Sequence, residues 1–153
     1  MKVKAVYFDM DGVLCDLYGV HNWRNLITRG DVTPYVKAGS LVNPGELYKV
    51  VTTLQERGLH VGVLTWGAKG SNKRFLKETK QAKLAWLART YKVVWNSVKV
   101  MPYGMDKSKY AMADSVLVDD SPINRARWNG LCAIDGGKQD MLTQLLAVTL
   151  GTC

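Results

Sequence analysis

The sequence has few cysteines and no long apolar run, and these absences exclude several classes of protein. Its three cysteines are widely spaced, so they form neither a disulfide framework nor a Cys-x-x-Cys metal site, which is typical of the reducing cytosol. No apolar stretch approaches the roughly 18 residues of a membrane span, and the N-terminus lacks a signal-peptide pattern. We therefore expect a cytoplasmic protein without a membrane partner.

The composition indicates one globular domain. Of the 153 residues, 47% are hydrophobic and 22% are charged, which suits a folded core rather than a disordered chain. We predict a single domain over residues 1–153. The formal net charge of +8 favours anionic partners, such as phosphorylated small molecules or nucleic acid.

Strand-like and helix-like segments alternate along the chain. The expected strands are residues 3–8, 59–64, 92–95, 98–101, 115–118 and 131–134. The expected helices are residues 44–57, 71–90, 107–113 and 139–150, with one more that begins at Ser121-Pro122. Strands separated by helices form parallel pairs. We predict an α/β fold with a Rossmann-like core, in which helices cover both faces of a doubly wound parallel sheet.

Three of the predicted strands end in polar residues. Asp9 and Asp11 follow the first, Thr65 follows the second, and Asp119-Asp120 ends a later one. Because the carboxyl ends of parallel strands share one edge of the sheet, we expect these groups to converge. Clustered carboxylates repel one another unless a cation relieves the cost, and oxygen ligands suit Mg²⁺ better than a soft metal. Taken singly each residue has a simpler role, such as capping a helix, but their coincidence favours a site.

These stretches resemble the four motifs of haloacid dehalogenase-type phosphatases. The matching residues are Phe8-Asp9-Met10-Asp11-Gly12-Val13-Leu14, Leu64-Thr65, a downstream lysine and Val118-Asp119-Asp120, in the family's order across nearly the whole chain. Within this superfamily the chain most resembles the small 5′(3′)-deoxyribonucleotidase-like branch and its phage-type relatives. The resemblance implies Mg²⁺-dependent hydrolysis of phosphomonoesters.

The resemblance also implies a role for each matched residue. Asp9 is expected to attack phosphorus as the nucleophile, and Asp11 to protonate the leaving oxygen and then activate water. Mg²⁺ is expected on the Asp9 carboxylate, the Asp11 backbone carbonyl and the Asp119-Asp120 pair, with Asp120 as the direct ligand and Asp119 holding a water or the lysine. Thr65 and the backbone N–H of the next residue are expected to bind phosphate. That next residue is Trp66, where relatives often carry a small polar residue.

The motif lysine has three candidates in the sequence. Its task is to neutralise the phosphate and the crowded carboxylates as a point charge. Lys107 is our first choice, because it follows a strand and opens a helix before the Asp119 strand. Lys109 also fits the family spacing, and Lys83 is the third candidate.

An insertion at about residues 16–43 forms a small cap, too short for a large independent lid. Such a cap leaves an open site that could admit a bulky phosphorylated end. Its aromatic and imidazole side chains could stack on a nucleobase or pack the cap onto the core. These side chains are Tyr18, His21, Trp23 and Tyr35.

A basic run follows Thr65. Lys69, Lys73, Lys77 and Lys80 are expected on one helical face, with Arg74 nearby. Cations early in a helix oppose its dipole, so helix stability does not explain them. The run is either a solvated face or a surface that attracts a polynucleotide end.

The expected function is a Mg²⁺-dependent phosphatase that acts on a nucleotide or related phosphomonoester. A polynucleotide 3′-phosphatase is the closest alternative. A phosphotransferase or phosphonatase would use the same motifs. A non-catalytic nucleic-acid-binding protein with this fold is the alternative from another class, although it would have no reason to keep four like charges together.

Overall fold

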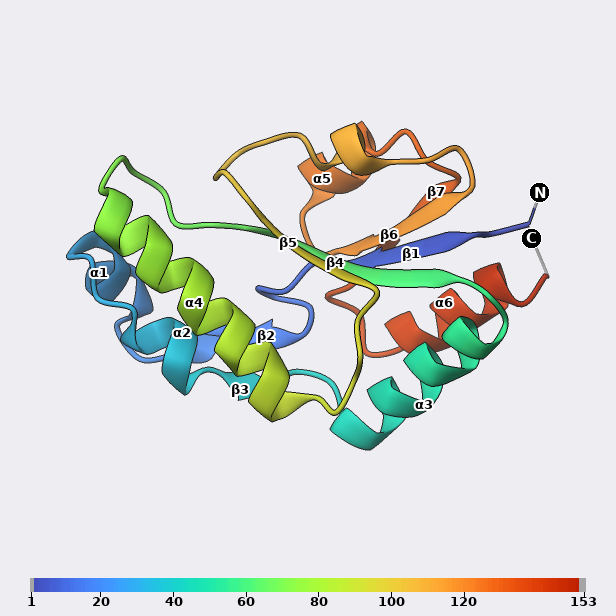
Figure 1. Ribbon diagram of the computed structural model, residues 1–153, viewed down its shortest axis with the longest axis horizontal. Helices are drawn as coiled ribbons and strands as arrows, with labels where there is room; N and C mark the ends of the chain where they lie inside the picture. Colours follow the sequence, from blue (N-terminus) through green and yellow to red (C-terminus); the bar gives the residue numbers. More distant parts are fainter. Residues whose placement is uncertain (1, 152–153) are drawn as a thin grey trace.

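The centre of the molecule is a five-stranded parallel sheet (Figure 1). The structure is a computed structural model that describes residues 2–151. In spatial order the strands are β5 (Ser97–Met101), β4 (His60–Trp66), β1 (Ala5–Phe8), β6 (Ser115–Asp119) and β7 (Cys132–Asp135). The chain builds one side of the sheet outward from β1 and then returns to build the other side. The predicted α/β fold with a parallel sheet is confirmed.

Helices cover both faces of the sheet, but unequally (Figure 1). One face carries α3 (Pro44–Glu56), α4 (Lys73–Thr90) and α6 (Met141–Thr149). The other carries the short α5 (Pro122–Arg127) and the 3-10 helix η2 (Lys107–Tyr110). Asn43 begins α3 by accepting a hydrogen bond from the N–H of Glu46, as N-cap residues do. No helix within residues 2–151 combines the length and apolar character needed to span a bilayer.

Strand β1 is buried on both faces, because successive side chains point to opposite sides of a strand. Val6 and Phe8 belong to the larger core, which the three long helices cover. Ala5 and Tyr7 belong to the smaller core, where they pack with Trp128 beyond the end of α5. This double burial explains why the strand reads as a continuous apolar run in the sequence.

Two of the predicted elements differ in the structure. Residues 92–95 form no strand; Val93 and Trp95 instead pack against the larger core, within the connection from α4 to β5. That prediction was wrong because an apolar run that packs against a core needs no neighbouring strand. The helix predicted over 107–113 is reduced to η2, because the backbone turns extended at Ala111. Strand β4, in contrast, continues through Thr65 to Trp66.

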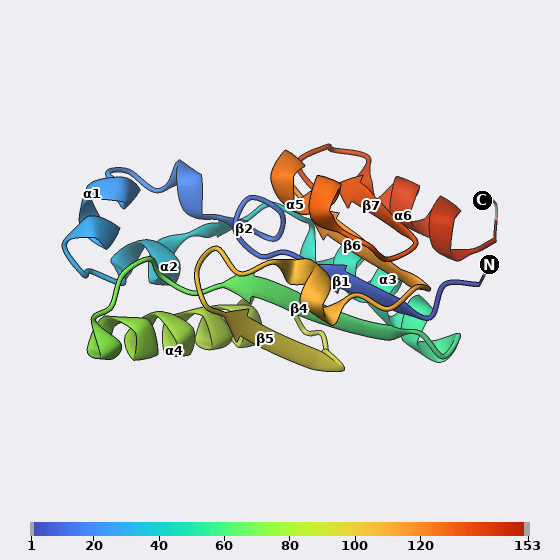
Figure 2. The same ribbon diagram turned by 90° about the horizontal axis from the view of Figure 1, so that it is seen from above.

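The insertion at 16–43 folds into a small cap beside α4 (Figures 1 and 2). Its elements are β2 (Cys15–Asp16), the 3-10 helix η1 (Leu17–Gly19), α1 (Trp23–Thr28), α2 (Thr33–Lys37) and β3 (Gly39–Ser40). Strands β2 and β3 pair antiparallel. Trp86 Nε1 on α4 donates to the Ala38 carbonyl at 2.8 Å, and the Tyr91 hydroxyl donates to the Leu14 carbonyl at 2.6 Å. The first bond ties the cap to α4, and the second fixes the chain just before the cap; the Tyr91 hydroxyl also lies 2.8 Å from the Ser40 hydroxyl of the cap.

Replacing Tyr91 by Phe should destabilise the protein by about 1 kcal/mol, because the buried Leu14 carbonyl would lose one of its two donors and keep only the Leu41 N–H. The Ser40 hydroxyl, 2.8 Å from the Tyr91 hydroxyl, would lose a partner too. Tyr48→Phe is the matched control, because Tyr48 is 49% exposed. Urea denaturation measures both variants, and equal stabilities would contradict the anchoring role of Tyr91.

Candidate functional site

The candidate site lies where β1 and β6 end side by side. Asp9 directly follows β1, and Asp119 is the last residue of β6. The two strands are held together up to this point, because the Asp9 N–H donates to the Val118 carbonyl at 2.8 Å. The strand order reverses between β1 and β6, and open α/β sheets bind ligands at such a reversal, outside the carboxyl ends of the strands.

Three carboxylates meet at this edge. Asp9, Asp119 and Asp120 each offer an oxygen within 4.8 Å of the others, so together they could hold a metal ion. Asp9 is 8% exposed and Asp119 is fully buried. Gly12 makes room for the third carboxylate, since a Cβ atom at Gly12 would lie 2.2 Å from Asp120 Oδ2. Gly12 also has φ +82°, which L side chains rarely adopt, so the turn after Asp11 is restricted to glycine on two counts.

Lys107 neutralises part of this negative charge. Its Nζ lies 2.7 Å from Asp9 Oδ1 and 2.7 Å from Asp119 Oδ2, and the residue is 2% exposed. Burial lowers the pKa of Lys107, but the charges of Asp9 and Asp119 outweigh burial and raise that pKa. Lys107 is therefore a permanent cation at the centre of the site.

Asp119 has further donors besides Lys107. Its Oδ1 accepts from the N–H of Ser121 at 2.9 Å, and its Oδ2 accepts from Asn124 Nδ2 at 3.1 Å. Asn124 is 5% exposed and is not identified by the sequence analysis. Its position three residues after the N-cap Ser121 of α5 was the available signal. Both oxygens of Asp119 are thus occupied by donors, which orient this carboxylate.

A second buried lysine, Lys83 of α4, holds Asp11. Lys83 is 1% exposed, and its Nζ lies 2.7 Å from Asp11 Oδ2, 2.9 Å from Thr65 Oγ1 and 2.6 Å from the Trp66 carbonyl. The Asp11 carboxylate is therefore paired with Lys83 and lies outside the group of three acids. Asp11 Oδ1 is buried and has no hydrogen-bond partner within residues 2–151, which leaves this oxygen for a ligand.

Thr65 and Trp66, at the end of β4, lie next to Lys83 and Lys107. Thr65 is fully buried; its hydroxyl accepts from Lys83 Nζ and lies 3.5 Å from the Trp66 carbonyl, which is too long a distance to hold the hydroxyl proton firmly. Trp66 Nε1 donates to the Met105 carbonyl at 2.9 Å, so its indole N–H is occupied within the protein. The Trp66 ring covers Lys107, whose Nζ is 5.8 Å from the ring centroid.

Lys109 is exposed on η2 and does not reach the acidic group. Three residues make a turn of a 3-10 helix, so two residues beyond Lys107 the chain faces another direction. The structure thus brings Lys107 and Lys83 to the site and leaves Lys109 at the surface. The sequence analysis expected one motif lysine, whereas two lysines pair with the carboxylates. Lys107 pairs with Asp9 and Asp119, and Lys83 pairs with Asp11.

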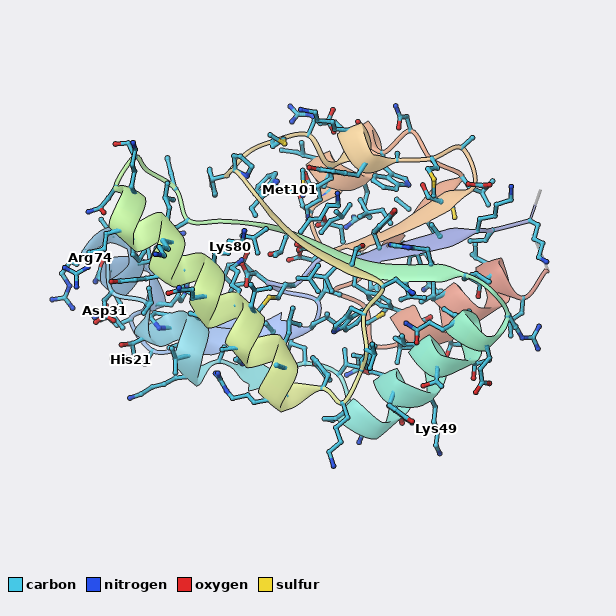
Figure 3. The ribbon with its side chains drawn as sticks, in the orientation of Figure 1. His21, Asp31, Lys49, Arg74, Lys80 and Met101 are labelled. Atoms are coloured by element: carbon cyan, nitrogen blue, oxygen red, sulfur yellow. The ribbon has the colours of Figure 1, made fainter. Side chains whose placement is uncertain are left out.

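A cleft of about 500 Å³ opens beside Asp11. Its walls come from the cap, from the end of β4 and from the loop after β5; Tyr18, Trp23, Tyr35 and Tyr103 are among the side chains that line it. Tyr18 is 52% exposed and packs on Trp23, whereas Tyr35 is 4% exposed. His21, the fourth cap residue predicted to meet a base, does not line this cleft and is exposed on the outside of the cap (Figure 3).

The aspartates have unusual protonation behaviour. Burial raises the pKa of Asp9 to about 8; Lys107 opposes this rise, while the charges of Asp119 and Asp11 add to it. Burial and the charge of Asp119 also raise the pKa of Asp120. The edge of the sheet therefore lacks enough positive charge to keep every carboxylate ionised, as expected of a site that also binds a cation.

Comparison with known proteins adds no assignment: no protein-family model matches this chain, and no curated protein matches it.

Replacing Asp9 by Asn should stabilise the metal-free protein at pH 8 by about 1–3 kcal/mol. Because the pKa of Asp9 is raised from 3.8 to about 8, the folded protein keeps a proton that the unfolded chain loses between these pH values. Stability attributable to Asp9 therefore falls as the pH rises from about 4 to about 8.

Thermal unfolding in EDTA, monitored by circular dichroism at several pH values, measures this difference. Asp140→Asn is the matched control, because Asp140 is exposed at the start of α6. Asp9→Asn should be close to the parent protein at pH 4 and more stable at pH 8. A variant that is less stable than the parent at pH 8 would contradict the effect of burial.

The pair formed by Lys83 and Asp11 should show strong energetic coupling. Lys83→Met should destabilise the protein by about 3 kcal/mol, because it leaves the largely buried Asp11 carboxylate without its cation. Combining it with Asp11→Asn should cost at least about 1 kcal/mol less than the sum of the single variants. Urea denaturation of the four proteins gives the coupling, and additive costs would show that the ion pair is unimportant.

Proposed function

We propose that this protein is a Mg²⁺-dependent phosphomonoesterase of the haloacid dehalogenase type that acts on nucleotides through an aspartyl-phosphate intermediate. The observation that carries the proposal is the environment of Asp9. This residue emerges at the reversal of strand order, next to two further carboxylates and 2.7 Å from the buried Lys107 ammonium. A structural aspartate gains nothing from so costly a position, whereas a nucleophile in a phosphate site needs both the acids and the cation.

In the first step an Asp9 oxygen attacks phosphorus, and the bond from phosphorus to the ester oxygen breaks. Lys107 stabilises the negative charge of the transferring group, because it remains a cation beside Asp9. Thr65 offers its hydroxyl to a phosphate oxygen. Lys83, which contacts both Thr65 and Asp11, fixes the relative positions of these two groups.

Asp11 moves the protons in this proposal. Its Oδ2 is held by Lys83, and its buried Oδ1 has no partner within the described part of the chain. Oδ1 is thus the oxygen that delivers a proton to the leaving alcohol and later accepts one from the water that hydrolyses the aspartyl phosphate. Asp11 also lines the cleft, so a substrate bound there can reach it.

The donor set suits Mg²⁺. Three carboxylates within 4.8 Å of one another supply hard oxygen ligands, and the raised pKa values of Asp9 and Asp120 indicate a deficit of positive charge. Asp9 and Asp120 would hold the ion, while Asp119 is engaged by Lys107, Ser121 and Asn124. When bound, Mg²⁺ neutralises charge on the phosphoryl oxygens and on the nucleophile.

The cleft supports a nucleotide as the substrate. Tyr18, Trp23 and Tyr103 give it flat apolar surfaces, which bind nucleobases by stacking. Within the cap, the Tyr18 and Trp23 rings pack edge to face with their centroids 5.1 Å apart, so each ring restricts the other before substrate arrives.

Phosphate release tests the proposal. The panel comprises deoxyribonucleotides, ribonucleotides and sugar phosphates, each with Mg²⁺ or with EDTA. We expect metal-dependent release that is fastest on nucleotides, and a loss of about 10³-fold or more in kcat for Asp9→Asn.

Asp140→Asn again serves as the control, because it makes the same chemical change at an exposed site and should retain full activity. Mass spectrometry after rapid acid quenching should detect one added phosphoryl group on the parent protein and none on Asp9→Asn. Release that is unaffected by EDTA, or that persists in Asp9→Asn, would overturn the proposal.

A further inference from the structure

A second cavity lies beside the cleft, and lysines line it. The cavity has a volume of about 620 Å³ and runs between the first turns of α4 and the loop after β5. We call it the lysine cavity and define it by Lys69, Lys77, Lys80 and Tyr103. It shares part of its wall with the cleft, because Gly67, Ala68, Lys69 and Tyr103 line both. A ligand in the cleft can therefore extend into the lysine cavity.

Lys77 and Lys80 make no ion pair in the described part of the chain that would stabilise the fold. Lys77 and Lys80 are exposed, and neither forms an ion pair within residues 2–151. Arg74 differs, because it pairs with Glu78 at 2.9 Å on the outside of α4. In Figure 3 Arg74 extends away from the molecule, whereas Lys80 lies on the side of α4 toward the sheet.

Their placement on α4 costs helix stability. Cations in the first turns oppose the helix dipole, and like charges three or four residues apart, such as Lys73, Lys77 and Lys80, repel one another. Lys69 lies before the helix rather than on the predicted helical face, and its Nζ is 6.0 Å from the centroid of the Tyr103 ring. An anionic ligand would offset the repulsion within this group.

Tyr103 stands at the junction of the two cavities. It is 54% exposed, and its ring centroid lies 5.2 Å from that of Trp66. An exposed aromatic ring next to a basic groove is the combination that binds single-stranded nucleic acid, because the ring stacks on an unpaired base and the cations neutralise the backbone. A mononucleotide would use the ring but would leave the lysines without an anion.

Building on the proposed phosphatase activity, we propose that the substrate is the phosphorylated end of a single-stranded oligonucleotide. The terminal phosphomonoester lies at Asp9, a base stacks on Tyr103, and the neighbouring backbone phosphates lie in the lysine cavity. The phosphatase thus prefers a chain end to a free nucleotide, and the preference resides in Lys77 and Lys80.

The test compares trinucleotides that carry a 5′- or a 3′-phosphate with the corresponding mononucleotides, all with Mg²⁺ and at several salt concentrations. We expect kcat/KM for one of the trinucleotides to exceed that of its mononucleotide by about tenfold at low salt. In Lys77→Ala/Lys80→Ala this ratio should fall close to one. The two termini distinguish a 5′-end from a 3′-end phosphatase.

The control is Lys49→Ala/Lys92→Ala, which removes the same charge from exposed lysines that line neither cavity. This control should keep the parent ratio. Binding of a fluorescent trinucleotide to the Asp9→Asn protein gives a second readout. The slope of log K against log salt should weaken by about 1.4 in the lysine-cavity variant, because each lost single-strand contact contributes about 0.7.

The outcomes separate the two proposals. Metal-dependent turnover of mononucleotides with no preference for trinucleotides would overturn the oligonucleotide substrate and leave the phosphatase standing. The same conclusion follows if the lysine-cavity variant behaves like the control. Absence of turnover on every substrate would overturn the phosphatase and with it the preference for a chain end.

Discussion

The burial of several carboxylates at one edge of the sheet constrains the rest of the structure. Ionised carboxylates that lie close together and are buried from water are stable only when cations lie beside them. The fold supplies two such cations. Lys107 comes from the short η2, which precedes β6 in the chain, and it faces Asp9 and Asp119. Lys83 comes from α4 on the opposite face of the sheet and faces Asp11. Each face of the sheet thus contributes one buried lysine, and both lysines form ion pairs with the aspartates at this edge.

The sheet and the acidic strand ends were predictable from the sequence, because both depend on local patterns. A buried run followed by Asp-x-Asp-Gly identifies β1 and its turn, and the same logic identifies Asp119 at the end of β6. The parallel topology then brings these ends together without further information. The metal, the substrate and the family stay predictions, because local patterns identify the acidic strand ends but not the ligand that they bind.

The division of labour between the lysines was not predictable, because it depends on which turn of a helix faces the sheet edge. Lys83 occupies the buried stripe that Phe75, Thr79 and Trp86 define, and a lysine in such a stripe was the available signal. The sequence analysis placed Lys107 first and named Lys109 before Lys83, although Lys109 is exposed on η2. The strand expected at 92–95 failed for a related reason, since an apolar run does not reveal whether it pairs or only packs.

Helix α4 contributes side chains to three different parts of the molecule. Trp86 anchors the cap, Lys83 holds Asp11, and Lys77 with Lys80 lines the neighbouring cavity. A residue inserted between Lys77 and Lys83 would rotate one part of the helix relative to the other by about 100°. The contacts of Trp86 and Lys83 and the position of Lys77 in the cavity wall could then not all be kept. The rotational register of α4 is thus a single constraint shared by the cap, Asp11 and the cavity, and changes of length are compatible with the fold only near the ends of the helix.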